Sequence, residues 1–260
     1  MTEQHADFAD RAGTALVIGG SGGLGRAIVR MLGERGSSVV ATYRGNQSKA
    51  ELAVTEARAY GVRGEARALD TLNTAAVREL VAAVVQRFGG LHTLVYAAGP
   101  HVPMKHLSKV EPDHLAAQLD VDAGAFFRVA SACLPALRES AGTIVAVTTA
   151  ATSRFPVRDG LSSAPKAAVE AIARALAAEE GRFGVRVNCV GPGMLTDGMA
   201  ESLISSGELD EFALEVARGN IPLRRFGQAV DIAEAVCFLA SDRAGFISGQ
   251  KLDVDGGYSV

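Results

Sequence analysis

The chain has 260 residues, of which 48% are hydrophobic and 21% are charged, and its formal net charge is −3. This composition is that of a globular protein with a large core, and the charge gives no reason to expect a nucleic-acid or membrane partner. The longest apolar runs, such as Leu80 to Val85, are too short to span a bilayer. Three scattered cysteines form no metal-ligand or disulfide pattern, and the acidic start resembles no secretory signal. We therefore expect a cytoplasmic protein without a metal.

Runs of β-branched residues alternate with helical patterns along almost the whole chain. Strands are predicted at 14–20, 37–43, 62–70, 92–99, 142–149, 185–193 and 250–257. Helices are predicted at 25–36, 48–61, 74–88, 113–138, 165–181 and 229–241. This alternation predicts an α/β fold: a single Rossmann-type, doubly wound parallel sheet of about seven strands with helices on both faces.

No linker divides the chain, so residues 12–260 are predicted to form one domain after a flexible amino-terminal tail at 1–11. The regular alternation stops after Asp197. The segment at about 197–225 is the one insertion large enough to form a lid or substrate loop.

A glycine-rich turn, GGSGGLG at residues 19–25, joins the first predicted strand to the first helix. Glycines allow a tight turn and the close approach of a pyrophosphate, whose charge then lies at the amino end of the helix. The strand–turn–helix context predicts a dinucleotide site rather than a purely structural turn. The predicted contacts are Gly19, Ser21, Gly22, Gly23, Leu24 and Gly25.

The second predicted strand ends in Thr42, Tyr43 and Arg44, with no Asp or Glu. An acid at this position bonds the ribose 2′-hydroxyl of NAD, whereas an arginine accommodates the 2′-phosphate of NADP. We therefore expect NADP(H) in preference to NAD(H), with Tyr43 and Arg44 at the ribose. The alternative is a solvated arginine in a loop.

Four further motifs accompany the glycine turn: YAAG at 96–99, the lysine in SSAPKAAVEA at 162–171, NCVGPGMLTD at 188–197 and ISGQKLDVDGG at 247–257. Together they resemble the short-chain dehydrogenase/reductase family over residues 12–260, and look closest to its 3-oxoacyl carrier-protein reductases and related NADPH-dependent ketoreductases. The resemblance implies hydride transfer with a small-molecule substrate and a homodimer or homotetramer. It also implies cofactor contacts at Asp70, Thr71, Ala97, Ala98, Gly99, Lys166, Pro192, Gly193, Leu195 and Thr196.

In that family a tyrosine protonates the carbonyl oxygen, a lysine four residues later lowers the tyrosine pKa, a serine polarises the carbonyl and an asparagine supports a proton relay. The matching positions hold Ser162, Lys166, Thr149 and Asp122, respectively, so only the lysine is kept. Thr149 retains a hydroxyl, but Ser162 is far less acidic than a phenol and too short to reach the carbonyl. Asp122 is interpreted as a solvated helix residue, a structural acceptor or a replacement acid.

The altered tyrosine position leaves several hypotheses open. His101, Lys105 and His106 are candidate proton donors, and an iminium or an enolate would need no protein acid. The leading hypothesis is an NADP(H)-dependent oxidoreductase acting on a carbonyl, imine or enoyl substrate. The alternative is an NADP(H)-binding sensor or scaffold without turnover. A serine hydrolase with Ser163 as nucleophile and Lys166 as base is rejected, because its companion motifs are missing.

Overall fold

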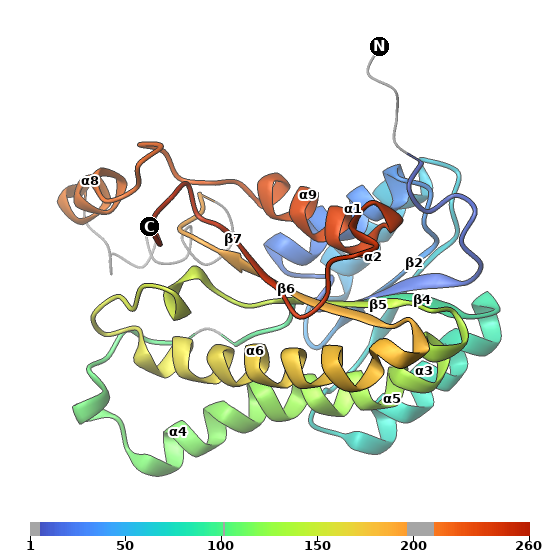
Figure 1. The fold of residues 1–260 in the computed structure, drawn as a ribbon, viewed down its shortest axis with the longest axis horizontal. Coiled ribbons are helices and arrows are strands. Elements are labelled where there is room, and N and C mark those ends of the chain that lie inside the picture. The colour runs from blue at the N-terminus through green and yellow to red at the C-terminus, as the bar shows by residue number, and fades with distance from the viewer. Residues whose placement is uncertain (1–5, 101, 197–210) are drawn as a thin grey trace.

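The computed structural model describes residues 6–100, 102–196 and 211–260. One parallel sheet runs through it, with the strand order β3-β2-β1-β4-β5-β6-β7 (Figure 1). The strands are β1 (Thr14–Ile18), β2 (Val39–Tyr43), β3 (Gly64–Ala68), β4 (Leu91–Tyr96), β5 (Thr143–Val147), β6 (Arg186–Pro192) and β7 (Lys251–Val254). The predicted doubly wound sheet is confirmed.

Helices cover both faces of the sheet, and each face buries its own apolar layer (Figure 1). On one face lie α1 (Gly23–Glu34), α2 (Gln47–Arg58) and α9 (Ala229–Ala240). On the other lie α3 (Thr74–Phe88), α4 (Pro112–Leu119), α5 (Ala125–Glu139) and α6 (Gly160–Glu180). Removing these two layers from water is the main contribution to the stability of the fold.

The order of the sheet reverses between β1 and β4, which are neighbours although two strands separate them in sequence. In an open parallel sheet, ligands bind outside the carboxyl ends of the strands at such a point. Here the loops after β1 and β4 meet, because the backbone N–H of Ala97 donates to the carbonyl of Ile18 at 2.9 Å. The topology therefore places a site at the carboxyl edge of the sheet, between β1 and β4.

The helix predicted at 113–138 is interrupted. A π-helical turn at Asp120–Gly124 separates α4 from α5. Within it, the carboxylate of Asp120 accepts a hydrogen bond from Arg128 at 2.6 Å. A Cβ at Gly124 would lie 2.5 Å from Asp120 Oδ1, so a larger residue there would displace the Asp120 carboxylate. The wider turn carries Asp122 into the protein, where its side chain is buried.

The predicted flexible tail is packed over residues 6–11. Phe8 is 1% exposed, and its ring stacks on His92 with the centroids 5.8 Å apart. Asp7 accepts a hydrogen bond from Arg35 at 3.1 Å. This part of the tail is held in place because the Phe8 ring packs on β4 and the Asp7 carboxylate bonds to the residue after α1. The composition of the tail does not reveal these contacts.

The segment predicted as a lid at about 197–225 is described from residue 211 onward, and residues 197–210 lie outside the described residues. Its described part contains α8 (Glu211–Gly219), followed by the buried Ile221. The backbone N–H of Leu223 donates to the carbonyl of Gly256 at 3.1 Å, so the end of the segment is tied to the carboxyl terminus. None of the helices in the described part of the chain is long and apolar enough to cross a membrane.

Candidate active site

The glycine turn brings three backbone segments so close that side chains would not fit. Gly19 has a φ of +84°, a conformation that favours glycine. A Cβ at Gly19 would lie 2.8 Å from the carbonyl oxygen of Ala97, and one at Gly25 would lie 2.1 Å from the carbonyl oxygen of Gly19. The N-cap of α1 is Gly22, which has no side chain to cover the helix end. This open, positively polarised helix end fits a pyrophosphate.

The remaining residues of the turn follow the same geometry. Gly22 and Gly23 are exposed, whereas Ser21 and Leu24 are partly buried. The N–H of Gly19 donates to Thr42 Oγ1 at 3.1 Å, which fixes the turn against β2. The six predicted contacts therefore lie at one helix end.

The end of β2 presents a cation and no acid. Tyr43 is the last residue of the strand and is half-buried, and Arg44 follows it and is exposed. Among the described residues, the Arg44 guanidinium has no hydrogen-bond or ion-pair partner. It is available for a phosphate, to which a guanidinium bonds with two parallel N–H groups.

The other predicted cofactor contacts follow the carboxyl ends of strands β3, β4 and β6: Asp70 and Thr71, then Ala97, Ala98 and Gly99, then Pro192, Gly193, Leu195 and Thr196. Several are fixed by backbone hydrogen bonds. The N–H of Gly193 donates to the carbonyl of Val254 at 3.0 Å, and that of Thr196 donates to the carbonyl of Gly227 at 2.9 Å. These segments border the same edge of the sheet as the glycine turn.

A buried ion pair lies at the end of β4. Lys166, on α6, donates from Nζ to Asp122 Oδ1 at 2.7 Å. The side chain of Asp122 is 2% exposed and that of Lys166 is 13% exposed. Lys166 Nζ also lies 3.4 Å from the carbonyl oxygen of Ala98, and a Cβ at Gly99 would lie 3.2 Å from it. Of the three interpretations of Asp122, the structure favours a buried acceptor, because the carboxylate is neither solvated nor free.

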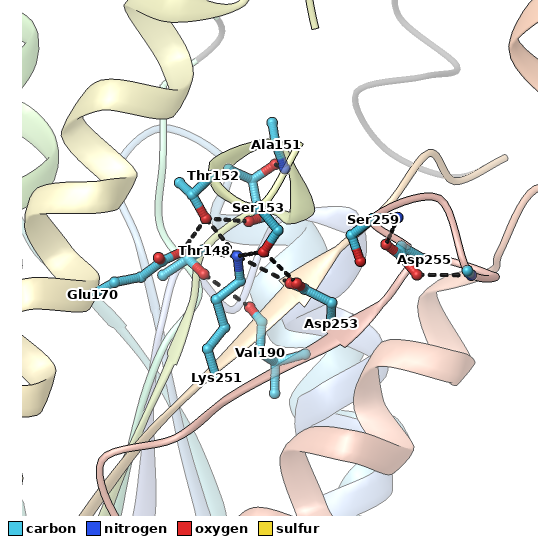
Figure 2. A network of polar contacts seen from close by, with 12 residues as sticks. Thr148, Ala151, Thr152, Ser153, Glu170, Val190, Lys251, Asp253, Asp255 and Ser259 are labelled. Atoms are coloured by element: carbon cyan, nitrogen blue, oxygen red, sulfur yellow. Dashed lines mark hydrogen bonds and ion pairs between the residues drawn. The ribbon is translucent and has the colours of Figure 1, made fainter. Parts of the chain in front are cut away.

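A second lysine, Lys251, is surrounded by more hydrogen-bond acceptors than Lys166 is (Figure 2). Lys251 Nζ donates to the hydroxyls of Thr152 and Ser153, and lies 3.1 Å from a carboxylate oxygen of Asp253 and 3.4 Å from one of Glu170. An ammonium has three N–H donors, and two hydroxyls and two carboxylate oxygens surround this one. Within the described part of the chain, Lys166 has one short acceptor and one distant carbonyl, so it keeps capacity to bond a ligand.

The hydroxyls predicted at the reaction centre are both present. Thr149 caps the short helix Ala150–Thr152, its Oγ1 accepting from the N–H of Ala151 at 3.1 Å. The Thr149 hydroxyl proton is therefore left for another acceptor. Ser162 is partly buried in the first turn of α6, which begins five residues earlier than the predicted start at Pro165. Lys166 and Asp122 are joined directly, whereas the side chains of Thr149 and Ser162 form no hydrogen bond with that pair.

Two supporting residues were not predicted to act at the site. Gln118 donates to Asp122 Oδ2 at 3.3 Å, and it stands four residues earlier, a spacing that brings side chains together on a helix. Tyr96, the last residue of β4, is buried beside Phe126. Burial and then the Asp122 charge raise the pKa of Tyr96, so its phenol stays neutral. Asp122 is thus bordered by two neutral groups and one cation.

A metal site would need several ligating side chains that converge on one point. In residues 6–100, 102–196 and 211–260, no three or more His, Cys, Asp or Glu side chains converge as a metal site would require.

Known proteins resemble this chain in sequence and fold. A family described as enoyl-(acyl carrier protein) reductase matches residues 19–259. The chain is 34% identical over 247 residues to the 3-oxoacyl-[acyl-carrier-protein] reductase FabG of Staphylococcus epidermidis, covering 94% of this chain and 98% of that one. A short chain dehydrogenase of Burkholderia cenocepacia J2315, solved in complex with NADP, superposes with a TM-score of 0.87 at 31% identity, covering 97% of this chain and 100% of that one. An actinorhodin polyketide ketoreductase variant, solved with NADPH, superposes with a TM-score of 0.87 at 29% identity, covering 95% and 97%. The sheet order, the glycine turn and these matches show that the chain is an oxidoreductase of the short-chain dehydrogenase/reductase family.

Proposed function

We propose that this protein is an NADP(H)-dependent oxidoreductase that transfers hydride between nicotinamide and a small carbonyl-type, imine or enoyl substrate, at a site that lacks the tyrosine proton donor. The observation that carries the proposal is the Lys166 ammonium, which lies beside Gly99 at the carboxyl end of β4 with donor capacity to spare. The bound cofactor supplies the hydride. The chain supplies binding, orientation and charge.

Each group at the site has a distinct task in this proposal. The amino end of α1 and residues 19–25 hold the pyrophosphate, and Arg44 holds the 2′-phosphate. Lys166, kept in place by Asp122, bonds the nicotinamide ribose. The Thr149 hydroxyl donates to the substrate carbonyl oxygen, because its own acceptor role is already filled by the Ala151 N–H. Ser162 contributes no acid, since an aliphatic hydroxyl does not ionise in this pH range.

Preference for NADP(H) over NAD(H) is tested by replacing Arg44 with alanine. Loss of charge-assisted bonds to the 2′-phosphate is expected to weaken NADPH binding about 10- to 100-fold and to leave NADH binding nearly unchanged. The measurement is a titration followed by nicotinamide fluorescence, with the exposed Arg182→Ala at the opposite edge of the sheet as control. Equal weakening of both nucleotides would contradict the phosphate assignment. Failure of the wild type to bind either nucleotide would contradict the proposed function.

A second function, an NADP(H)-binding sensor or scaffold without turnover, is favoured by the same site. Residue 162 is a serine, and Lys166 is already paired with Asp122. The two functions separate when wild-type protein that binds NADPH is incubated with acetoacetyl-CoA, 1-pyrroline and crotonyl-CoA, as carbonyl, imine and enoyl probes. Oxidation of NADPH with any of them supports the oxidoreductase, and binding without oxidation supports the sensor.

Self-association belongs to the proposal as well. Helices α5 and α6 lie side by side on the outer side of one sheet face, and the exposed Phe127 on α5 offers an apolar contact to a second copy (Figure 1). A homodimer or homotetramer is expected in light scattering. A location in the cytoplasm stays a prediction.

A further inference from the structure

The geometry points to Asp159 as the general acid that replaces the tyrosine, donating its proton to the carbonyl oxygen of the substrate. This inference rests on the proposed function and deepens it, because it names the group that makes carbonyl reduction possible at this site. It also specifies the substrate class, since neither an iminium nor an enoyl acceptor would need such an acid.

Asp159 lies on the face of α6 that carries the site residues. It is the N-cap of the helix, with Ser162 three residues later and Lys166 four residues after that. Residues at this spacing lie on one helix face. Lys166 shows where that face points, because its Nζ reaches Asp122 and the carbonyl oxygen of Ala98 at the end of β4. Asp159 therefore stands about two turns before Lys166, on the same side as the residue in the tyrosine position.

The carboxyl group of Asp159 does not perform the structural task of its position. An aspartate at an N-cap normally accepts a hydrogen bond from the helix backbone, but this side chain makes none. The residue serves the helix through its backbone carbonyl, which accepts from the N–H of Ser162 at 3.0 Å and of Ser163 at 2.9 Å. Among the described residues, the half-buried Asp159 carboxyl has no hydrogen-bond or ion-pair partner. Its proton is free for a ligand.

The turn that presents Asp159 is strained and fixed. Arg158 has a φ of 76°, in the left-handed region that is costly for a residue other than glycine. Its guanidinium donates to the carbonyl of Met104 at 3.1 Å, and a Cβ at Gly160 would lie 2.7 Å from Leu107. The turn is thus locked against the loop after β4. Strained backbone of this kind is concentrated at functional sites, where it orients a side chain.

A basic hollow lies beside this turn. It has a volume of about 530 Å³ and is lined by Met104, Lys105, His106, Lys109 and Arg158. Arg158, which lines the hollow, directly precedes Asp159 in the chain, and Asp122 is already paired with Lys166. Burial is the cause that raises the pKa of Asp159 to about 6, so a useful fraction of the carboxyl is protonated near neutral pH.

The step is balanced without a further reagent. As the carbonyl carbon accepts the hydride, its oxygen takes the proton of the Asp159 carboxyl. The O–H bond of Asp159 breaks and the O–H bond of the product alcohol forms, while the two electrons come from the reduced dinucleotide. The Asp159 carboxylate regains a proton from water after the product leaves.

The test is the pH profile of kcat/KM for NADPH-dependent reduction of acetoacetyl-CoA. In the wild type, kcat/KM is expected to fall about tenfold for each pH unit above about 6, since only the protonated acid reacts. Asp159→Asn is expected to lower it by about 10²–10⁴-fold and to abolish this limb. Adding Ser162→Tyr to Asp159→Asn is expected to restore activity, with a profile that stays flat well past neutral pH because a phenol is then the donor.

Three further measurements make the test specific. The control Asp113→Asn, an exposed acid in the first turn of α4, is expected to keep the wild-type profile. His106→Gln is expected to keep the limb, and loss of the limb in that variant would overturn the inference. In cofactor-free protein, the infrared band of a protonated carboxyl is expected to titrate near pH 6 in the wild type and to be absent from Asp159→Asn.

The outcomes distinguish this inference from the proposed function. A wild type that reduces the ketone, with Asp159→Asn keeping both rate and limb, overturns only the role of Asp159. A wild type that binds NADPH and reduces none of the probes overturns both the acid and the oxidoreductase.

Discussion

The two edges of the sheet each bury an ionisable side chain, and they treat it differently. At the amino edge, His92 at the start of β4 has both ring nitrogens engaged: Nδ1 lies 2.9 Å from Thr93 Oγ1, and Nε2 lies 3.3 Å from Ser37 Oγ. The ring also stacks on Phe8. At the carboxyl edge, the carboxyl of Asp159 has no such partner among the described residues.

Burial pushes both groups toward their neutral forms, lowering the pKa of His92 to about 4 and raising that of Asp159 to about 6. The consequence depends on what surrounds each neutral group. Both ring nitrogens of His92 bond to neighbouring side chains, so the shift of its pKa affects the stability of the fold. Asp159 keeps an unused proton beside a hollow, so its shift serves chemistry. A perturbed pKa therefore indicates function only where the hydrogen bonds of the group are open.

The largest expected effect at the carboxyl edge comes from breaking its ion pair. Lys166→Met leaves the Asp122 carboxylate buried without its cation, and is expected to lower the free energy of unfolding by about 3–5 kcal/mol. The double variant Lys166→Met/Asp122→Asn is expected to recover most of this loss, because no charge then remains buried. Urea unfolding of the single and double variants gives the coupling energy.

Lys251→Met is the matched control for that cycle. Its carboxylate partners, Glu170 and Asp253, are more exposed than Asp122 and keep the hydroxyls of Thr152 and Ser153 as donors. A smaller loss of about 1–3 kcal/mol is expected. If Lys251→Met were less stable than Lys166→Met, the result would contradict the difference drawn between Lys166, which has unused donors, and Lys251, which is surrounded by acceptors.

The next prediction concerns the amino edge of the sheet, where part of the amino-terminal tail packs. Phe8→Ala removes a ring that is 1% exposed, and is expected to cost about 3–4 kcal/mol in the free energy of unfolding. The control is Phe246→Ala, at a fully exposed ring, where a change within about 0.5 kcal/mol is expected. Equal effects of the two substitutions in urea unfolding would mean that the tail does not seal this edge.

Most of the fold could be predicted because it is encoded locally. Alternating apolar runs and helical periodicity located the seven strands and the helices between them, except α8, which lies in the segment after Asp197 where the alternation stops. Two features could not be found this way. The π-helical turn at Asp120–Gly124 is accompanied by a bond from Arg128 back to Asp120, and the packed tail by the stacking of Phe8 on His92 in a distant strand. Both are tertiary contacts that leave no periodic signal.

The site residues likewise divide into those that local motifs predict and those that depend on tertiary contacts. The glycine turn and Lys166 follow local motifs, so the sequence located them. The partner of Lys166 is Asp122, 44 residues away, and that bond appears only when α6 packs beside the π-helical turn. Asp159 gave no signal at all, because an acid before a helix is ordinarily a cap. Only the structure shows that its side chain does not cap.

The smallest effect is the pH dependence that His92 gives to stability. Its pKa is lowered from 6.5 to about 4 by burial and, more weakly, by the charge of Arg11, so the folded protein binds fewer protons than the unfolded chain between these values. Stability from this residue is therefore complete above pH 6.5 and declines as pH falls toward about 4, by about 3 kcal/mol in total. Urea unfolding at several pH values, wild type against His92→Asn, isolates this contribution because the exposed histidines cancel. Asp159 acts with the opposite sign, because burial raises its pKa from 3.8 to about 6: its contribution to stability is complete below pH 3.8 and is lost as pH rises through about 6, and Asp159→Asn is expected to remove that loss.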